Sequence, residues 1–260
     1  MRLPGGLLRE GELRRQFRFR EPDGALELSI LEGARRREPL PRQVSRVLVA
    51  ALEHLGGEPP ELAKVEELCI ADRQFLMRRL RTWLGDEQPW HTVRCTGCQE
   101  RFDFELNVAE LPVKEAGAGF PFVEVETGQG RVRGRVPTGA DQLALAERVT
   151  ADVRALLERC LFPADVARLE EGDIALIEEA LEAVSPGVVT RVGATCPGCG
   201  ATQVVTLEPY SCLFMESTLL EEVHTLASAY HWSERDILAL PLHRRRQYLR
   251  LVERATGQVA

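Results

Sequence analysis

Apolar and polar residues alternate with two different periods along the chain, and the period predicts which segments are strands and which are helices. A period of two predicts short strands at 16–19 and 131–136. Apolar residues three and four positions apart predict helices over 41–55 and 141–161. The chain therefore contains two strand–helix series, one in each half.

A second helix is predicted in each series, beginning at Asp72 and at Asp173. An aspartate at the N-cap accepts a hydrogen bond from a first-turn N–H, which is why a helix is expected to start there. Strand-like alternation then resumes on both sides of a Cys-x-x-Cys pair, so each pair is expected in the turn of a hairpin. The apolar positions after the pairs are Phe102, Phe104, Leu106, Val204, Val205 and Leu207.

The shared order of elements predicts an internal duplication. The two Cys-x-x-Cys pairs are 101 positions apart, and so are the two predicted helix starts. Upstream, residues 52–53 match residues 157–158, and residues 23–25 resemble residues 138–140. The predicted fold class is α+β: two degenerate repeats of strand, helix, helix and knuckle hairpin, followed by a C-terminal helical segment.

Composition shifts divide the chain into three parts. The run Ala-Gly-Ala-Gly at 116–119 indicates a joint, and the glycines within 128–130 indicate the turn of a hairpin that follows it. We therefore expect a first repeat over 1–115, a linker hairpin and second repeat over 116–210, and a helical tail over 211–260.

The tail has the pattern of three helices. Leu213–Tyr230 is predicted to be helical, with one apolar face formed by Leu219, Leu220, Val223, Leu226 and Ala227. Ser233 is expected to cap a short helix, with Asp236 at the reach-back position of a capping box. A last helix is expected to end near Ala255, where Gly257 is a plausible stop.

Charge and hydropathy exclude several classes of protein. The formal net charge is −7, which argues against a protein that coats nucleic acid through excess basic residues. Arginine clusters at 14–20, 35–37 and 244–246 are interpreted as solvated faces or partner-facing patches. No segment has the roughly 20 apolar residues of a membrane span, and the N-terminus lacks the apolar core of a secretory signal.

Four of the seven cysteines form the pairs Cys95/Cys98 and Cys196/Cys199. A Cys-x-x-Cys turn places two sulfurs on one side of a tight loop, and two such turns supply the four sulfurs of a closed tetrahedral zinc site. Equivalent positions in two repeats favour one shared structural Zn²⁺. Four thiolates leave no open position for a catalytic water.

Three other interpretations compete with the shared zinc site. Cys196 and Cys199 resemble a redox dithiol, although such cysteines usually open a helix. Two separate metal sites would add His91 to the first pair and Cys212 or His224 to the second. The cysteines could also be reduced and bind nothing. The remaining cysteines are interpreted as buried apolar residues: Cys69, Cys160 and Cys212.

No catalytic motif is apparent. The chain has five histidines, none within H-E-x-x-H, and it has no G-x-S-x-G nucleophile elbow. We therefore expect a protein that is not an enzyme and takes no small-molecule substrate.

The end of the chain resembles a known family. The segment 228–241 (SAYHWSERDILALP), followed by RRRQYL at 244–249, is similar to the C-terminal signature of T4-type baseplate proteins of contractile phage tails and extracellular contractile injection systems. The two cysteine knuckles resemble those of the longer injection-system members. The candidates for partner contact in this region are Tyr230, Trp232, Arg244, Arg245 and Tyr248.

The resemblance implies a structural or assembly role in the hub or wedge of a baseplate. Its partners would be other baseplate, hub or tube proteins, met in the cytoplasm during assembly or within the assembled particle. A zinc-ribbon nucleic-acid binder is the alternative, and a Cys-x-x-Cys dithiol oxidoreductase is a further one. Salt-dependent DNA binding would favour the former.

Overall fold

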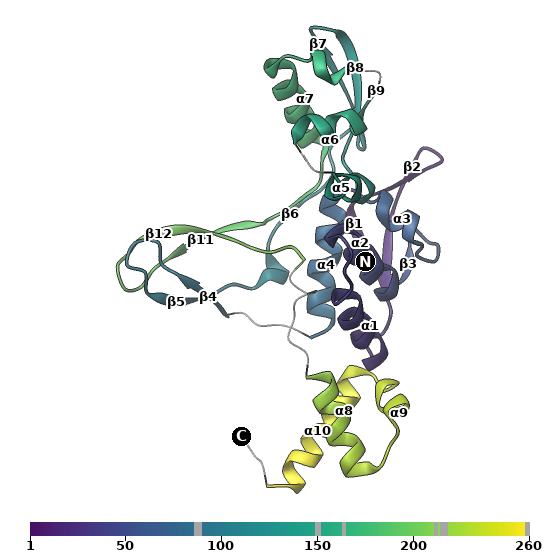
Figure 1. Ribbon diagram of the computed structural model, residues 1–260, viewed down its shortest axis with the longest axis vertical. Helices are drawn as coiled ribbons and strands as arrows, with labels where there is room; N and C mark the ends of the chain where they lie inside the picture. The colour runs from purple at the N-terminus through teal and green to yellow at the C-terminus, as the bar shows by residue number, and fades with distance from the viewer. Residues whose placement is uncertain (86–89, 149–151, 163–164, 211–212, 214–217, 258–260) are drawn as a thin grey trace.

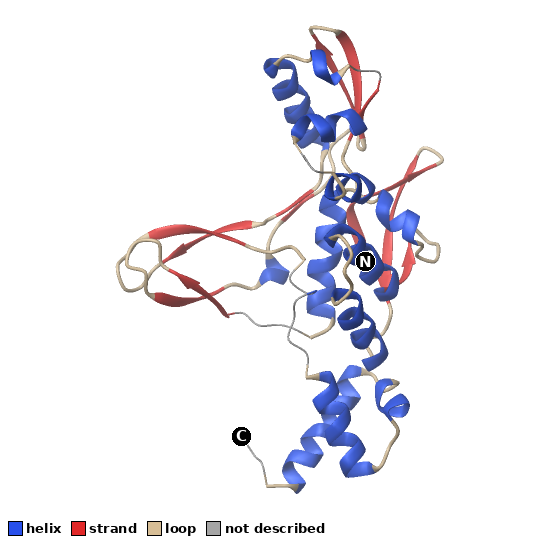
Figure 2. Cartoon of the chain, in the orientation of Figure 1, coloured by secondary structure: helices blue, strands red, loops and turns tan. Residues whose placement is uncertain are grey.

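The computed structural model describes residues 1–85, 90–148, 152–162, 165–210, 213 and 218–257. It is a mixed α+β fold with several small antiparallel sheets and four parts (Figures 1 and 2). We call them the central body (residues 2–83 and 139–146), the upper lobe (122–135, 153–162 and 166–184), the cysteine arm (90–105 and 191–206) and the tail (219–255). The arm projects sideways from the body.

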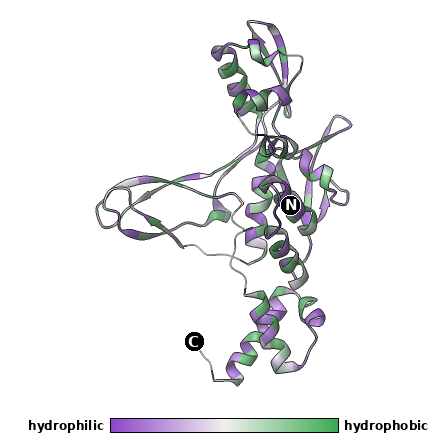
Figure 3. Ribbon diagram, in the orientation of Figure 1, coloured by the Kyte–Doolittle hydropathy of each residue, from purple (hydrophilic) through white to green (hydrophobic). Residues whose placement is uncertain are grey.

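The central body packs helices against a three-stranded sheet of order β1-β2-β3. Its strands are β1 (Arg2–Arg9), β2 (Glu12–Phe19) and β3 (Leu52–Leu55), and its first four helices are α1 (Gly24–Ala34), α2 (Leu40–Ala51), α3 (Leu62–Glu67) and α4 (Ile70–Trp83). The apolar stripe of α2 includes Val44 and Leu48, which are fully buried with Leu76 of α4. Figure 3 shows hydrophobic and hydrophilic residues interleaved along the helices, as expected when one face of each is buried.

The upper lobe has its own sheet, of order β7-β8-β9, and its own core. Its elements are β7 (Phe122–Thr127), β8 (Gly130–Arg135), α6 (Val153–Cys160), β9 (Leu161–Phe162), a 3-10 turn η2 (Val166–Arg168) and α7 (Glu171–Val184). Val123, Leu157 and Ile177 are buried between the sheet and the helices. The hairpin with its turn at 128–130 is confirmed.

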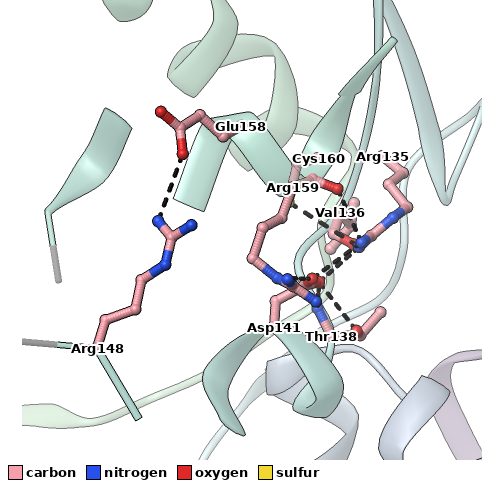
Figure 4. Close-up of polar contacts among 8 residues, drawn as sticks. All are labelled: Arg135, Val136, Thr138, Asp141, Arg148, Glu158, Arg159 and Cys160. Atoms are coloured by element: carbon pink, nitrogen blue, oxygen red, sulfur yellow. Dashed lines mark hydrogen bonds and ion pairs between the residues drawn. The ribbon is translucent and has the colours of Figure 1, made fainter. Parts of the chain in front are cut away.

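Helix α5 (Gly139–Ala146) follows β8 but packs against α2, α3 and α4 of the central body. Its Asp141 is fully buried and accepts hydrogen bonds from Arg135 (2.6 and 2.9 Å) and from Nε of Arg159 (2.9 Å), as Figure 4 shows. Burial acts to raise the pKa of Asp141, but the bonds from Arg135 and Thr138 outweigh it and hold the pKa below its usual value. This cluster connects the body to the upper lobe.

The tail consists of α8 (Leu219–Tyr230), α9 (Glu234–Leu238) and α10 (Leu242–Ala255). Ser233 caps α9 by accepting from the N–H of Asp236, as predicted. Leu226 and Ile237 are buried in a small core that also contacts Leu28 of α1. Leu220, predicted to lie on the buried face, is 55% exposed. Residues 214–217, the start of the predicted helix, lie outside the described residues.

The cysteine arm is made of two hairpins. Its strands are β4 (Trp90–Arg94), β5 (Arg101–Glu105), β11 (Arg191–Thr195) and β12 (Thr202–Thr206). A short pairing of β6 (Val113–Lys114) with β10 (Gly187–Val188) lies where the chain leaves one hairpin and enters the other, and a 3-10 turn η1 (Val108–Glu110) follows β5. Both hairpins predicted around the cysteine pairs are confirmed.

Two predicted helices differ from the structure. The helix predicted over 41–55 ends at Ala51, because 52–55 pairs with β2 as the strand β3. The helix predicted over 141–161 is two helices, α5 and α6, and residues 149–151 between them lie outside the described residues. The match of 52–53 with 157–158 is therefore wrong, since it aligns a strand with a helix. Strand β1 and helix α1 were not predicted.

The prediction that Asp72 and Asp173 are N-caps is wrong. The N-caps are Cys69 and Glu170, and the two aspartates occupy the third position of α4 and α7. Asp72 is fully buried and accepts hydrogen bonds from the backbone N–H groups of Gly5 and Gly6 at 2.8 and 2.7 Å. Asp173 accepts from the N–H of Gly128 at 2.9 Å. Both carboxylates thus bind a distant part of the chain, and Asp173 also accepts from the N–H of Glu170 as the third residue of a capping box.

Within the described residues, no helix combines the length and the apolar character needed to cross a membrane.

Candidate metal centre

The first cysteine turn closes the β4–β5 hairpin. The N–H of Cys95 donates to the carbonyl of Glu100 at 2.8 Å, and the N–H of Gln99 donates back to the carbonyl of Cys95 at 3.0 Å. The N–H groups of Gly97 and Cys98 point at Sγ of Cys95, at 3.3 and 3.5 Å. These donors stabilise negative charge on the sulfur, which is the electrostatic role expected of a metal-binding knuckle.

The second turn, in the β11–β12 hairpin, repeats this backbone pattern. The N–H of Cys196 donates to the carbonyl of Ala201, and the N–H of Gly200 donates to the carbonyl of Cys196, both at 2.9 Å. Gly200 has a positive φ of 75°, and its counterpart Gln99 has 64°. Only glycine adopts this conformation without strain, so the two turns have the same shape at different conformational cost.

The four sulfurs lie together at the end of the arm. Sγ of Cys95 is 3.5 Å from Sγ of Cys199, Sγ of Cys98 is 3.7 Å from Sγ of Cys196, and all four lie within 4.8 Å of one another. A tetrahedral zinc ion with bonds of about 2.3 Å would place its sulfurs about 3.8 Å apart. A disulfide needs about 2.05 Å, and all four cysteines are free. The cluster can hold one metal ion.

Burial and charge in the cluster are uneven. Cys95 and Cys196 are buried, whereas Cys98 and Cys199 form the outer side. The N–H of Cys98 and then that of Gly97 lower the pKa of Cys95 to about 6, against the effect of burial. The N–H of Glu100 also acts to lower the pKa of Cys98, but burial and the neighbouring sulfurs raise it to about 12. The raised pKa means that Cys98 becomes a thiolate at neutral pH only if a cation offsets the charge of the neighbouring sulfurs.

The hairpins also contact each other through Gln203 of β12. Its Oε1 accepts from the N–H of Thr96 at 2.7 Å, and its Nε2 donates to the carbonyl of Arg94 at 3.0 Å. A Cβ added to Gly97 would lie 3.2 Å from Cβ of Ala201, so the two turns approach closely. These contacts hold the four sulfurs in register.

The structure does not bring His91 or His224 to the cysteine pairs, as two separate metal sites would require. His91 lies on β4 with its ring 5.6 Å from that of Phe104, and His224 is exposed on α8. Among the described residues, the cluster contains neither histidine, and Cys212 lies outside the described residues. The predicted burial of Cys69 and Cys160 is confirmed.

The candidates for partner contact lie on the tail. Tyr230 stacks on Trp232 with ring centroids 4.8 Å apart, and Trp232 meets Tyr248 edge-on at the same distance. Arg244 is exposed at the start of α10. These three rings and one cation form a half-buried surface that a partner could reach.

Arg245, also predicted to contact a partner, has a fully buried side chain. It donates to Glu27 of α1 at 2.6 Å and to Glu222 of α8 at 2.7 Å. Burial acts to lower its pKa, but the two carboxylates raise it. Its charge thus joins the tail to the central body, and we do not assign it to the partner surface.

One further functional candidate, Arg78 of α4 near the arm, is buried, and its burial was not predicted from the sequence. An arginine in a helix has no local pattern that marks it as buried, since the walls that enclose it come from distant segments.

The chain was compared with protein-family models, curated proteins and solved structures, and none of the three comparisons finds a match.

Proposed function

We propose that the chain is a structural protein whose arm is held closed by one Zn²⁺ on Cys95, Cys98, Cys196 and Cys199. The observation that carries the proposal is the convergence of four sulfurs from two hairpins 101 positions apart at distances that suit a tetrahedral ion. Four protein ligands leave zinc no open position, so the ion stabilises and does not activate water. Metal binding then contributes directly to folding.

The same proposal includes the duplication. In each half, an antiparallel hairpin is followed by two helices, a third strand on the same sheet, a short helical segment (α3 or η2), a long helix and a cysteine hairpin. The residues 23–25 and 138–140, matched from sequence, surround the starts of α1 and α5. The common order supports two degenerate repeats that present equivalent cysteine turns to one ion.

The biological role that we propose is assembly or structure in the baseplate of a contractile injection system, through contacts with hub, wedge or tube proteins. Support comes from the resemblance of 228–249 to the family signature. The aromatic cluster of Tyr230, Trp232 and Tyr248 within that segment, with Arg244 beside it, is the surface we assign to a partner.

Metal analysis of the purified chain tests the zinc site. We expect one zinc per chain, lost on substitution of any of the four ligands, for example Cys98→Ser or Cys199→Ser. Cys160→Ala is the matched control: this cysteine lies outside the arm, so the variant protein should still bind one zinc. No zinc, two zincs, or a reversible Cys196–Cys199 disulfide in a chain that folds without metal would contradict the proposal.

Co-expression with the tube, sheath and spike genes of a contractile system from the same cells tests the biological role. We expect a stable complex with a baseplate or tube protein that is weakened at least tenfold by Trp232→Ala combined with Arg244→Glu. Arg250→Glu, on the same helix, is the control. Failure to bind any of these proteins, together with salt-dependent DNA binding, would favour the nucleic-acid alternative.

A further inference from the structure

A cavity of about 290 Å³ lies at the base of the cysteine arm, between α4 and the two hairpins. Residues of α4, β4 and β12 line it, together with the segments on either side of β11–β12. The cavity is distinct from the sulfur cluster, because none of the four cysteines lines it and they lie in the turns of the two hairpins. Figure 1 shows these turns at the end of the arm away from α4. The walls of the cavity thus come from the parts of the chain that the cluster connects.

Arg78 lines this cavity, and its side chain is 8% exposed. Its Nη2 donates to the carbonyl of Leu111 at 3.2 Å, whereas Nε and Nη1 are buried without a hydrogen-bond partner in the described part of the chain. Burial, and then the nearby charge of Arg79, lower its pKa. A buried guanidinium with unmatched donors is costly unless an anion completes it.

A second unmatched donor or acceptor faces the same space. Nε2 of His91 is buried and has no hydrogen-bond partner among the described residues, and the residue lines the cavity. Arg81 also lines it but has an interaction of its own, so we do not count it toward the site. Among the described residues that line the cavity, the single carboxylate belongs to Glu208, which is exposed. The polar groups of the cavity therefore favour a negative ligand.

The remaining walls are mostly apolar and include Val93, Val188 and Val205. The volume lies at the lower end of the roughly 300–1,000 Å³ of small-molecule sites, so it admits one side chain or a small acid and excludes a nucleotide. One buried guanidinium balances one negative charge. We propose that this cavity binds a carboxylate carried on a short apolar stem, with Arg78 as its charged contact and His91 as a second hydrogen-bond partner.

The carboxylate could belong to a free organic acid or to an Asp or Glu side chain of a partner protein. The geometry that supports the site does not depend on the proposed baseplate role. It depends on the arm being closed, so the metal content of each sample is measured in parallel. If a chain that holds zinc does not bind the carboxylate, the cavity proposal is wrong. If the chain holds no zinc, the proposed metal centre is wrong.

Titration of the isotope-labelled full-length chain with butyrate tests the proposal. We expect a saturable shift of the Arg78 Nε–Hε NMR signal with a Kd on the order of 1 mM, as suits a ligand of so few atoms. Butyramide, which has the same shape without the charge, should cause no such shift. No saturable shift with butyrate, or an equal shift with butyramide, would overturn the proposal.

Substitutions then assign the contact. Followed on the backbone amide signals of Val93 and Val205, which also line the cavity, Arg78→Gln should raise the Kd for butyrate at least tenfold. If the glutamine variant fails to fold, Arg78→Lys takes its place and should keep part of the affinity. Arg79→Gln is the matched control: this neighbour lies over the Phe75 ring and does not line the cavity, so its Kd should change less than twofold. An Arg79 effect as large as the Arg78 effect would contradict the assignment.

A short peptide with one central glutamate, compared with butyrate, identifies the source of the carboxylate. Binding of the peptide at least tenfold more tightly supports a protein ligand, and equal or weaker binding supports a free acid. Absence of binding by both would overturn the site itself.

Discussion

The central body and the cysteine arm are stabilised in different ways. Among the described residues, the cluster centred on the body buries twenty apolar residues, including Leu3, Leu48 and Leu76 of the body and Leu213 from outside it. The arm buries four, namely Cys95, Phe102, Ala194 and Cys196, and two of these are proposed metal ligands. Its sheets have two strands each, and isolated two-stranded hairpins are marginally stable in water.

The difference indicates where a bound metal ion would contribute most to stability. Removal of water from apolar surface stabilises the body without help. The arm buries little apolar surface, so we propose that a metal–thiolate centre holds it closed. The following predictions test this contrast, from the largest expected effect to the smallest.

Metal removal should open the arm and leave the body folded. A structural zinc contributes on the order of 10–16 kcal/mol in small zinc-dependent domains at pH 7. After chelation, we expect amide hydrogen exchange to speed up more than a hundredfold across 90–105 and 191–206, with little change in α2. Equal loss of protection in both regions would show that the body also depends on the metal, and unchanged exchange in the arm would show that the metal is dispensable.

Leu48→Ala should have the opposite effect. Its side chain is fully buried between helices, and truncation of such a leucine costs about 3–5 kcal/mol. Urea unfolding followed by helical circular dichroism measures the loss, and zinc content should stay at one per chain. Leu251→Ala, at a residue that is 50% exposed, is the control and should change stability by about 0.5 kcal/mol or less. Loss of zinc in the Leu48 variant would contradict the separation of the two regions.

Asp141→Asn should weaken the connection between the body and the upper lobe by about 2–3 kcal/mol, because it leaves two arginines without their buried partner. The folded pKa of Asp141 lies below its unfolded value of about 3.9. Its contribution is therefore fully present above that value and is lost as the pH falls through the folded pKa. Unfolding curves from pH 7 to pH 3 should show the native and variant proteins converging in acid. A constant difference down to pH 3 would contradict this assignment.

Gln99→Gly should have the smallest effect, a gain of about 1 kcal/mol, because glycine removes the strain of a positive φ in the first turn. Gly200→Ala should cost about the same in the second turn, since an added Cβ there meets no atom within 4 Å and the penalty is purely conformational. Competition with a zinc chelator measures both changes, each expected to be about fivefold in affinity. Changes of the same sign in both variants would show that the turns do not share one backbone shape.

Local sequence chemistry determined several features of this protein. The two Cys-x-x-Cys turns, their flanking strands, the glycine turn before β8 and the Ser233 cap of α9 all follow from hydrogen bonds between residues close in sequence. Spacing alone also indicated that two equivalent cysteine pairs should be considered together. The baseplate role and the identity of the metal remain predictions.

Only the tertiary structure decided which distant groups meet. Local rules predicted Asp72 to cap a helix, and burial instead directs its carboxylate to the backbone of β1. Residues 52–55 extend a helical pattern, yet a free edge of β2 makes them a strand. Arg245 and Arg78 are both helical arginines with the pattern of solvated residues. Arg245 is paired with carboxylates from two other helices. Arg78 lines a cavity whose other walls come from the two hairpins. The energy of a charge depends on the solvent and partners around it, and these are set by chain segments far away in sequence.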